Sequence, residues 1–438
     1  MNKINKLLLI ASAICGFSNA SFASDVESGS MPVVSDLKVK LSGYGHFQAG
    51  HRNQNHLIGN DKNVSANRSS FAFFNNAALF TDISNEVNDV TYGGKIVLVP
   101  TAKRKGGNTY NGSHIYLESS YGRIEAGSPL DAASNMFVDS GAIASATGGG
   151  DWDRYAKFDS SNLLQGKEFG PSFATFGEFF LDSKLITSSE TRTYSTEPGR
   201  RISYYTPKFD FGRGSKVQLG VSYTPDSSNT GADNPDKDST GSDKKNIGNN
   251  QYFEFHRSVK DAISGGVVLE QNISDGVDVK LALTGEFGKA AKVKLIDDTD
   301  PKDLKTLGVY KLKDLRTYNI GTVLNVGNFS YAASFGSLGK SLTTAEFHKT
   351  GRDTTYYTGG IAYKQGPFTA SVTYFRSAQF KNTVDCITIG TDYKLAPGFK
   401  PYAEISGFSL KGKPEFYPDL QKKKTRGTVA LIGAKLSL

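Results

Sequence analysis

The sequence predicts an all-β fold, a transmembrane antiparallel β-barrel of about 16 strands. Three observations favour it. Apolar and polar residues alternate with a period of two in segments that recur to the end of the chain. The connections between these segments alternate between short turns and long polar loops. Glycine is abundant at 47 residues, and the 28 phenylalanines and 21 tyrosines suit a long sheet better than helices.

The first 23 residues have the features of a secretory signal peptide. Lys3 and Lys6 precede a compact apolar stretch from Leu7 to Phe17, and small residues including Ala23 stand before Ser24. The apolar stretch is too short to cross a membrane as a helix. We therefore expect cleavage before Ser24, which leaves residues 24–438 as the transmembrane β-barrel domain.

The mature chain is expected to hold one cysteine and a weak positive charge. Cleavage removes Cys15 and leaves Cys386 alone, so an internal disulfide is excluded. The net charge falls from +8 to +6, because the removed segment holds two lysines and no acidic residue. This charge is dispersed along the chain and does not indicate a nucleic-acid surface. No later segment reaches about 18 consecutive apolar residues, the length of a transmembrane helix.

The expected strands recur at regular spacing along the chain. They cover residues 38–50, 70–83, 90–100, 113–120, 122–128, 199–208, 215–225, 261–272, 277–287, 314–326, 328–338, 354–364, 367–377, 384–395, 399–409 and 426–438. The long connections include residues 129–198, 226–260 and 288–313, and residues 226–250 indicate an exposed, mobile loop. Short turns on one rim and long loops on the other are typical of a barrel in an outer membrane.

The two faces of the expected strands differ in polarity. In the last strand Ala430, Ile432 and Leu436 share one side, whereas Gly433 and Lys435 lie on the other. An apolar face toward lipid and a polar face toward a lumen are what a wide, water-filled barrel requires.

Four segments resemble the Gram-negative general porins, the trimeric diffusion channels of outer membranes. They are Val39–Gly45, Leu117–Gly127, Arg201–Pro207 and Gly427–Leu438. The resemblance covers nearly the whole mature chain. It implies a homotrimer, a water-filled pore for passive diffusion of small hydrophilic solutes and ions, and neither a cofactor, a metal nor an enzymatic reaction. The chain departs from the family at Leu438, where phenylalanine is usual.

In that family the third long loop folds into the barrel and narrows it. The matching stretch here is 129–198, so the resemblance implies an acidic side of the constriction made by Asp131, Asp139, Asp151 and Asp153. The resemblance implies a basic wall opposite, and strand parity points Lys40, Arg68, Lys95, Arg123 and Arg201 into the lumen. Family position agrees with parity for Lys95 and Arg123, whereas Ser203 stands where the family usually has a basic residue, with Arg201 two positions earlier. Opposite charges across a narrow gap create a transverse field that orients polar solutes. Asp151 and Asp153 flank Trp152 beside Arg154, and a local ion pair that anchors the loop is the alternative.

Two motifs suggest a phosphate-binding loop or a zinc site, but each lacks a residue that such a site needs. Gly339, Lys340 and Ser341 resemble the end of a phosphate-binding loop, but Ser334 stands where that loop needs glycine. His46, His51 and His56 have no acidic or cysteine partner that would complete a zinc site.

Two other functions remain open. His114 with Ser119 or Ser120 is the closest match to a hydrolase pair, although no third group orients it. The long loops leave open a surface adhesin or receptor, which would be preferred if residues 129–198 plugged the lumen. Cys386 is expected to be a small packing residue.

Overall fold

The computed structural model describes most of the barrel domain. Its described residues are 37–55, 70–99, 110–148, 150–156, 200–227, 243–248, 251–255, 259–290, 292–297, 305–341, 353–379, 382–411 and 424–438. The expected signal peptide, Arg68, His56 and residues 157–198 of the expected third loop lie outside them.

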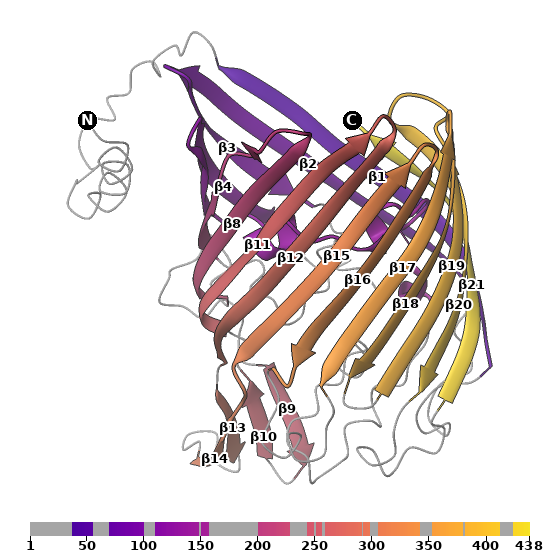
Figure 1. The fold of residues 1–438 in the computed structure, drawn as a ribbon. Coiled ribbons are helices and arrows are strands. Elements are labelled where there is room, and N and C mark those ends of the chain that lie inside the picture. Colours follow the sequence, from indigo (N-terminus) through magenta and orange to yellow (C-terminus); the bar gives the residue numbers. More distant parts are fainter. Residues whose placement is uncertain are drawn as a thin grey trace, which may run out of the picture. The chain divides into compact units, whose positions relative to one another are not determined.

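Strands make up nearly all of the described chain (Figure 1). The main sheet contains β1 (Lys38–Gln54), β2 (Phe71–Val87), β3 (Val90–Leu98), β4 (Tyr110–Ser119), β5 (Gly122–Gly127), β6 (Arg201–Tyr205), β7 (Phe209–Asp210), β8 (Ser215–Asp226), β11 (Val259–Ser274), β12 (Val277–Ala290), β15 (Leu315–Val326), β16 (Phe329–Gly339), β17 (Thr354–Gln365), β18 (Phe368–Gln379), β19 (Asn382–Tyr393), β20 (Phe399–Lys411) and β21 (Lys424–Ser437).

The main sheet closes on itself, because β1 pairs antiparallel with both β2 and β21. Among the described residues it has 17 strands, and the short β6 and β7 both pair with β8. Pro207, which lacks a backbone N–H, lies between β6 and β7, so the two are one interrupted position in the wall. The result is a closed antiparallel barrel of 16 positions, which confirms the predicted fold class.

The connections are short at one end of the barrel, as the sequence predicts. Asn88 and Asp89 join β2 to β3, and both have positive φ, at 50° and 61°. A two-residue hairpin turn of this type needs positive φ at both central positions, which asparagine and aspartate tolerate. Gly276, Gly327 and Gly366 also adopt positive φ in the turns that follow β11, β15 and β17.

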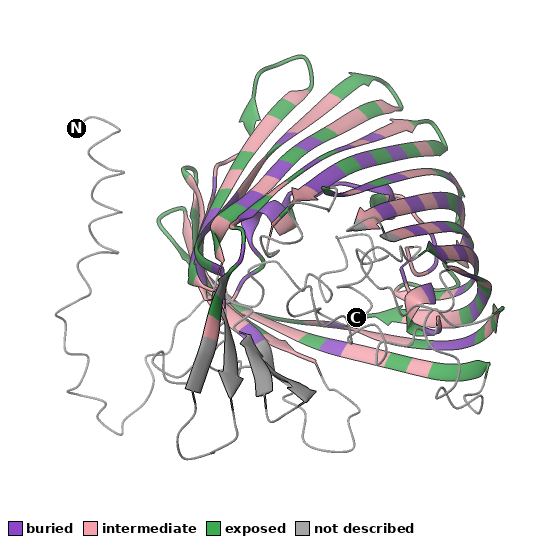
Figure 2. Cartoon of the chain, turned by 90° about the horizontal axis from the view of Figure 1, so that it is seen from below, coloured by how far each residue is buried: buried purple, intermediate pink, exposed green. Residues whose placement is uncertain are grey.

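The two faces of the wall differ as expected. Along β19 the outward Ile387 and Ile389 are 51% and 57% exposed, whereas Thr388 between them is 4% exposed. Figure 2 shows this alternation as bands along the strands. Exposed isoleucine, valine and phenylalanine on the outer face match a lipid environment, and serine, threonine and charged residues face inward.

Two long connections that the sequence predicts to be irregular contain strands instead. They are β9 (Asp243–Gly248), β10 (Gln251–Phe255), β13 (Lys292–Asp297) and β14 (Lys305–Lys311), which form a second sheet in the order β14-β13-β10-β9. The expected mobile loop at 226–250 therefore ends in a strand. Each connection forms a hairpin, and the pairing of β10 with β13 joins the two hairpins. These backbone pairings override the weak local pattern of each connection.

Within the described residues between β5 and β6 there are three short helices. They are α2 (Ala132–Asn135), η2 (Ser140–Ala142) and η3 (Trp152–Arg154). No helix in the described part of the chain is long and apolar enough to span a membrane.

Candidate pore lining

The segment 131–156 runs along the inward faces of successive strands. α2 contacts β6, β8, β11 and β12, η2 contacts β16, β17 and β18, and η3 contacts β21. The chain leaves β5, follows the wall through most of its circumference, and reaches β1, where Arg52 donates a hydrogen bond to the carbonyl oxygen of Tyr155 at 3.0 Å.

Small inward residues make room for this segment. A Cβ on Gly321 of β15 would stand 1.9 Å from the carbonyl oxygen of Val138. A Cβ on Gly50 of β1 would stand 2.2 Å from the ring of Tyr155. Any side chain at either position would displace the segment, so these glycines are needed for close backbone approach.

Hydrogen bonds attach the segment to strands that lie far away in sequence. The Ala132 N–H donates to Ser222 Oγ on β8 at 2.7 Å, and the Ser145 N–H donates to Ser371 Oγ on β18 at 2.8 Å. The strongest attachment is at Thr147, whose hydroxyl lies 2.9 and 2.7 Å from the two carboxylate oxygens of Glu404 on β20. The Thr147 N–H also donates to Glu404, at 3.1 Å. Hydrogen bonds to an ionised carboxylate are shorter and stronger than hydrogen bonds between neutral groups.

Asp131 and Arg201, which the sequence places on opposite sides of a constriction, contact each other. Arg201 Nη1 lies 3.3 Å from Asp131 Oδ2, and both side chains are fully buried. Asp131 also caps α2 by accepting from the Ser134 N–H at 2.9 Å. This buried pair ties the start of the segment to β6, so we do not include either residue in the proposed pore lining.

Asp139 is also buried, at 1% exposure, and caps η2 by accepting from the Gly141 N–H at 2.8 Å. Asp151 and Asp153 are partly exposed, and Asp151 lies 3.0 Å from the guanidinium of Arg154. The guanidinium also stacks on the ring of Phe74, 4.1 Å from its centroid. Trp152 stacks on Phe408 of β20 at 4.7 Å between ring centroids. The local ion pair considered from the sequence is thus present, and it accompanies an aromatic anchor.

The predicted basic residues on β1, β3 and β5 occupy inward positions. Lys40 pairs in register with Asp82, Asp82 with Lys95, and Lys95 with His114. The Lys95 ammonium lies 5.3 Å from the ring centroid of Phe80. These three strands lie on the part of the wall next to where the segment 131–156 begins. Eight positions separate β4 from β17, where η2 packs, so η2 lies across the barrel from β4.

Arg123 is surrounded by carboxylates. Its guanidinium lies 2.9 Å from Glu118 and 2.7 Å from Glu125, and it stacks on the ring of Tyr116 at 3.9 Å. Asp82 accepts a hydrogen bond from the Tyr116 hydroxyl at 2.8 Å. Sequence reasoning missed these three acids, although the parity that placed Arg123 inward places them inward too.

The other residues that the sequence analysis weighed for metal binding, catalysis or phosphate binding contact neighbouring side chains or lie in strands and turns of the barrel wall. His46 Nε2 lies 2.6 Å from the Tyr402 hydroxyl, and Cys386 is buried against Thr388. His114 faces inward on β4, whereas Ser119 has the opposite parity. Gly339 ends β16, and Lys340 and Ser341 follow in a turn. Among the described residues no group of three or more histidine, cysteine or acidic side chains is arranged to hold a metal.

Comparison with known proteins identifies one matching family and several similar proteins. Residues 8–413 match the family described as Gram-negative porin. A protein of Rickettsia bellii (strain RML369-C) is 43% identical over 446 residues, which cover 98% of this chain and 99% of that protein. A protein of Rickettsia felis (strain ATCC VR-1525 / URRWXCal2) is 42% identical over 451 residues, covering 99% and 100%.

Among solved structures, the anion-selective porin from Comamonas acidovorans is similar, with a TM-score of 0.53 and 14% identity. The match covers 92% of this chain and 100% of that one. At this identity the likeness shows the fold alone.

Proposed function

The chain belongs to the Gram-negative porin family and is an outer-membrane β-barrel, and from this we propose that it conducts small hydrophilic solutes and ions by passive diffusion. The family and the fold point to a channel rather than an enzyme. We also propose that residues 1–23 are removed on export and that the mature chain assembles as a homotrimer.

The attachment of the segment 131–156 to the wall carries the proposal. Its contacts with β8, β18, β20 and β1 hold it flat against the inward faces of these strands. A segment held this way narrows a lumen and stays in place as solutes pass. The wall of β3, β4 and β5 then supplies the charged surface past which solutes move.

The charges of that surface nearly cancel. On β3–β5, Lys95 and Arg123 face inward with Glu118 and Glu125, which gives two cations and two carboxylates. Closely spaced opposite charges orient dipolar solutes but produce little net potential. Screening at physiological salt, where the Debye length is about 8 Å, weakens any remainder. We therefore propose weak ion selectivity in place of the strong anion preference that a purely basic wall would give.

Single-channel recording tests the proposal. The protein is purified from outer membranes, inserted in a planar bilayer, and recorded under a tenfold gradient of KCl. Large, long-lived conductance steps with a reversal potential near zero are expected, and closures in groups of three indicate a trimer. Correctly folded protein that gives no steps would contradict the proposal and favour a plugged barrel whose loops bind a partner. A reversal potential near either Nernst limit would contradict weak selectivity alone.

A further inference from the structure

One histidine lies where the end of the segment 131–156 meets the barrel wall. His46 is half-buried on the inward face of β1, and its Nε2 lies 2.6 Å from the hydroxyl oxygen of Tyr402 on β20. The same hydroxyl donates to Gln48 Oε1 at 2.8 Å. A tyrosine hydroxyl has one proton to donate, so it accepts the hydrogen bond from His46. His46 therefore carries its hydrogen on Nε2, and Nδ1 is the nitrogen that takes up a proton.

The charged groups around His46 come from β21 and from the segment. Lys435 on β21 lies directly opposite His46 in the register. At η3, Asp151 and Arg154 interact with His46 electrostatically. The side chains that β2 and β20 place next to it are Phe74, Asn76 and Tyr402. A proton on His46 thus adds a positive charge beside two cations and one acid.

Lys435 is one of the groups that hold the segment to the wall. Its ammonium donates a hydrogen bond to the carbonyl oxygen of Ala146 and lies 5.8 Å from the ring centroid of Tyr402. On the other side of the same residue, the Ala146 N–H donates to Asp392 Oδ2 at 3.1 Å. Like charges at directly opposite positions of neighbouring strands repel each other. A charge on His46 therefore weakens the hold of Lys435 on Ala146.

The same charge acts on the ion pair at η3. Arg154 stacks on Phe74 at 4.1 Å from the ring centroid, and the ring of His46 lies 6.2 Å from that of Phe74. Arg154 also lies 3.0 Å from Asp151. A protonated His46 repels Arg154 and attracts Asp151, so both effects pull this ion pair apart.

We propose that His46 is an acid-sensitive switch whose protonation releases residues 146–155 from β20, β21 and β1. The neutral ring keeps the segment attached, and the charged ring opposes the contacts made by Lys435 and Arg154. Because the released state binds one proton more than the attached state, acid favours release. Histidine changes its charge between about pH 8 and about pH 5, so the switch operates in that range. Only its effect on current rests on the proposed function.

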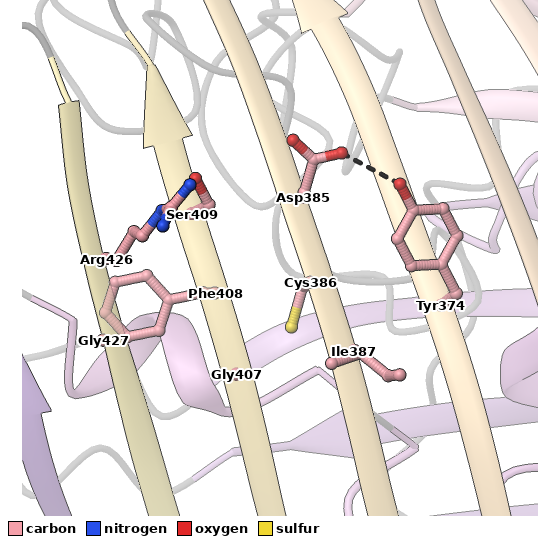
Figure 3. Close-up of a pocket in the computed structure, with 9 residues that line it drawn as sticks. All are labelled: Tyr374, Asp385, Cys386, Ile387, Gly407, Phe408, Ser409, Arg426 and Gly427. Atoms are coloured by element: carbon pink, nitrogen blue, oxygen red, sulfur yellow. Dashed lines mark hydrogen bonds between the residues drawn. The ribbon is translucent and has the colours of Figure 1, made fainter.

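Trp152 reports the release directly, because it is the one tryptophan of the chain and belongs to η3. It is fully buried and stacks on Phe408 of β20. Phe408 lies beside Cys386 and Gly427 of the neighbouring strands, and neither of these is charged (Figure 3). A tryptophan that leaves these surroundings for water becomes accessible to acrylamide, which quenches its fluorescence.

The test is acrylamide quenching of mature protein folded in detergent, at about pH 7.5 and about pH 5. The quenching constant of wild type is expected to rise at least about threefold at the lower pH, because local release exposes the segment to solvent. His46→Gln keeps a side-chain N–H for Tyr402 but takes up no proton, and is expected to keep the low constant at both pH values. Unchanged heat-resistant gel mobility shows that the barrel stays closed.

A matched control replaces another inward histidine. His114 lies on β4, and β1, β2 and β3 stand between this strand and β21. His114→Gln is expected to respond to acid as wild type does. Three outcomes would overturn the proposal: no acid response in wild type, an equal response in His46→Gln, or loss of the response in His114→Gln. The second outcome would assign the change to a carboxylate.

A second variant removes the opposing charge and keeps the histidine. Lys435→Gln is expected to give a smaller rise in the quenching constant than wild type, because His46 then gains its proton without a cation opposite. A rise as large as that of wild type would contradict repulsion as the cause of release.

Single-channel recording separates this switch from the proposed function. Wild-type current is expected to show more closures at about pH 5 than at about pH 7.5, and His46→Gln is expected to show the same current at both. Protein without current steps at either pH would contradict the proposed function, whereas the quenching experiment still decides the switch. Release of Trp152 without any change in current would contradict the role of the segment in narrowing the lumen.

Discussion

At the scale of single residues, environment separates the acids of the third loop into two kinds. Asp131 is fully buried against Arg201 and caps a helix, so it stabilises the barrel interior. We expect Asp131→Ala to lower the free energy of unfolding by about 3–5 kcal/mol, because it leaves the Arg201 guanidinium buried without its partner. Urea unfolding in lipid vesicles measures this, with the exposed turn variant Asp275→Ala as control. Equal stability of the two variants would contradict a structural role for the pair.

Asp139 and Asp151 are predicted to differ in their effect on ion selectivity, although each carries one carboxylate. Asp139→Asn keeps the oxygen that caps η2, and the side chain is buried, so the reversal potential is expected to stay at the wild-type value. Asp151 is partly exposed beside Arg154, so Asp151→Asn is expected to shift the reversal potential toward anions. The two recordings are made under the same KCl gradient. A shift from Asp139→Asn as large as that from Asp151→Asn would mean that Asp139 lines the pore.

Replacement of Arg123 or Lys95 is expected to shift the reversal potential toward cations, opposite to the shift expected from Asp151→Asn. Arg123→Ala leaves Glu118 and Glu125 uncompensated, and Lys95→Ala leaves Asp82 next to one lysine fewer. Each variant is expected to raise cation preference and to raise conductance for bulky solutes, because a long side chain is removed from the wall. Arg213→Ala, in an exposed turn, is the control. Reversal potentials that match the control would remove β3 and β5 from the narrow part of the pore.

At the scale of elements, the period-two pattern was sufficient to predict the strands of the barrel wall and the direction of their side chains. The pattern places Lys95 and Arg123 inward because a strand has two faces and one must meet lipid. It does not reveal that Arg201 meets Asp131, since that contact depends on where a loop lies. It also misses β9, β10, β13 and β14, which form two local hairpins that are joined by the pairing of β10 with β13.

The attachment of the third loop to the wall at Thr147 is predicted to keep the open-channel current constant. Thr147→Val removes the hydroxyl bonded to both oxygens of Glu404 but keeps the shape of the side chain. The buried carboxylate then loses partners, and the loop segment is expected to fluctuate between attached and released positions. Open-channel current noise is expected to rise several-fold over wild type in single-channel recordings. Thr428→Val, on the outer face of β21, is the control, and equal noise in both variants would contradict the attachment.

At the scale of the whole molecule, closure of the barrel depends on the pairing of β1 with β21, which we call the seam. Closure brings β1 and β21 together, and Leu438 exchanges backbone hydrogen bonds with Gly43 at 2.9 and 3.2 Å. A closed barrel has no edge strand, so no row of backbone groups is left exposed to lipid. The last residues therefore complete the wall whether the final side chain is leucine or phenylalanine.

The seam predicts where a single substitution prevents closure. Ile432 pairs with Ala49 of β1 and with Ala403 of β20, so its N–H serves the ladder on one of these sides. Ile432→Pro removes that N–H in a place where lipid supplies no replacement, and we expect the protein to lose the folded, heat-resistant form seen as altered gel mobility. Ile432→Val keeps the backbone bonds and the apolar outer face, and it is expected to fold like wild type. A proline variant that folds and conducts normally would mean that the barrel tolerates an open seam.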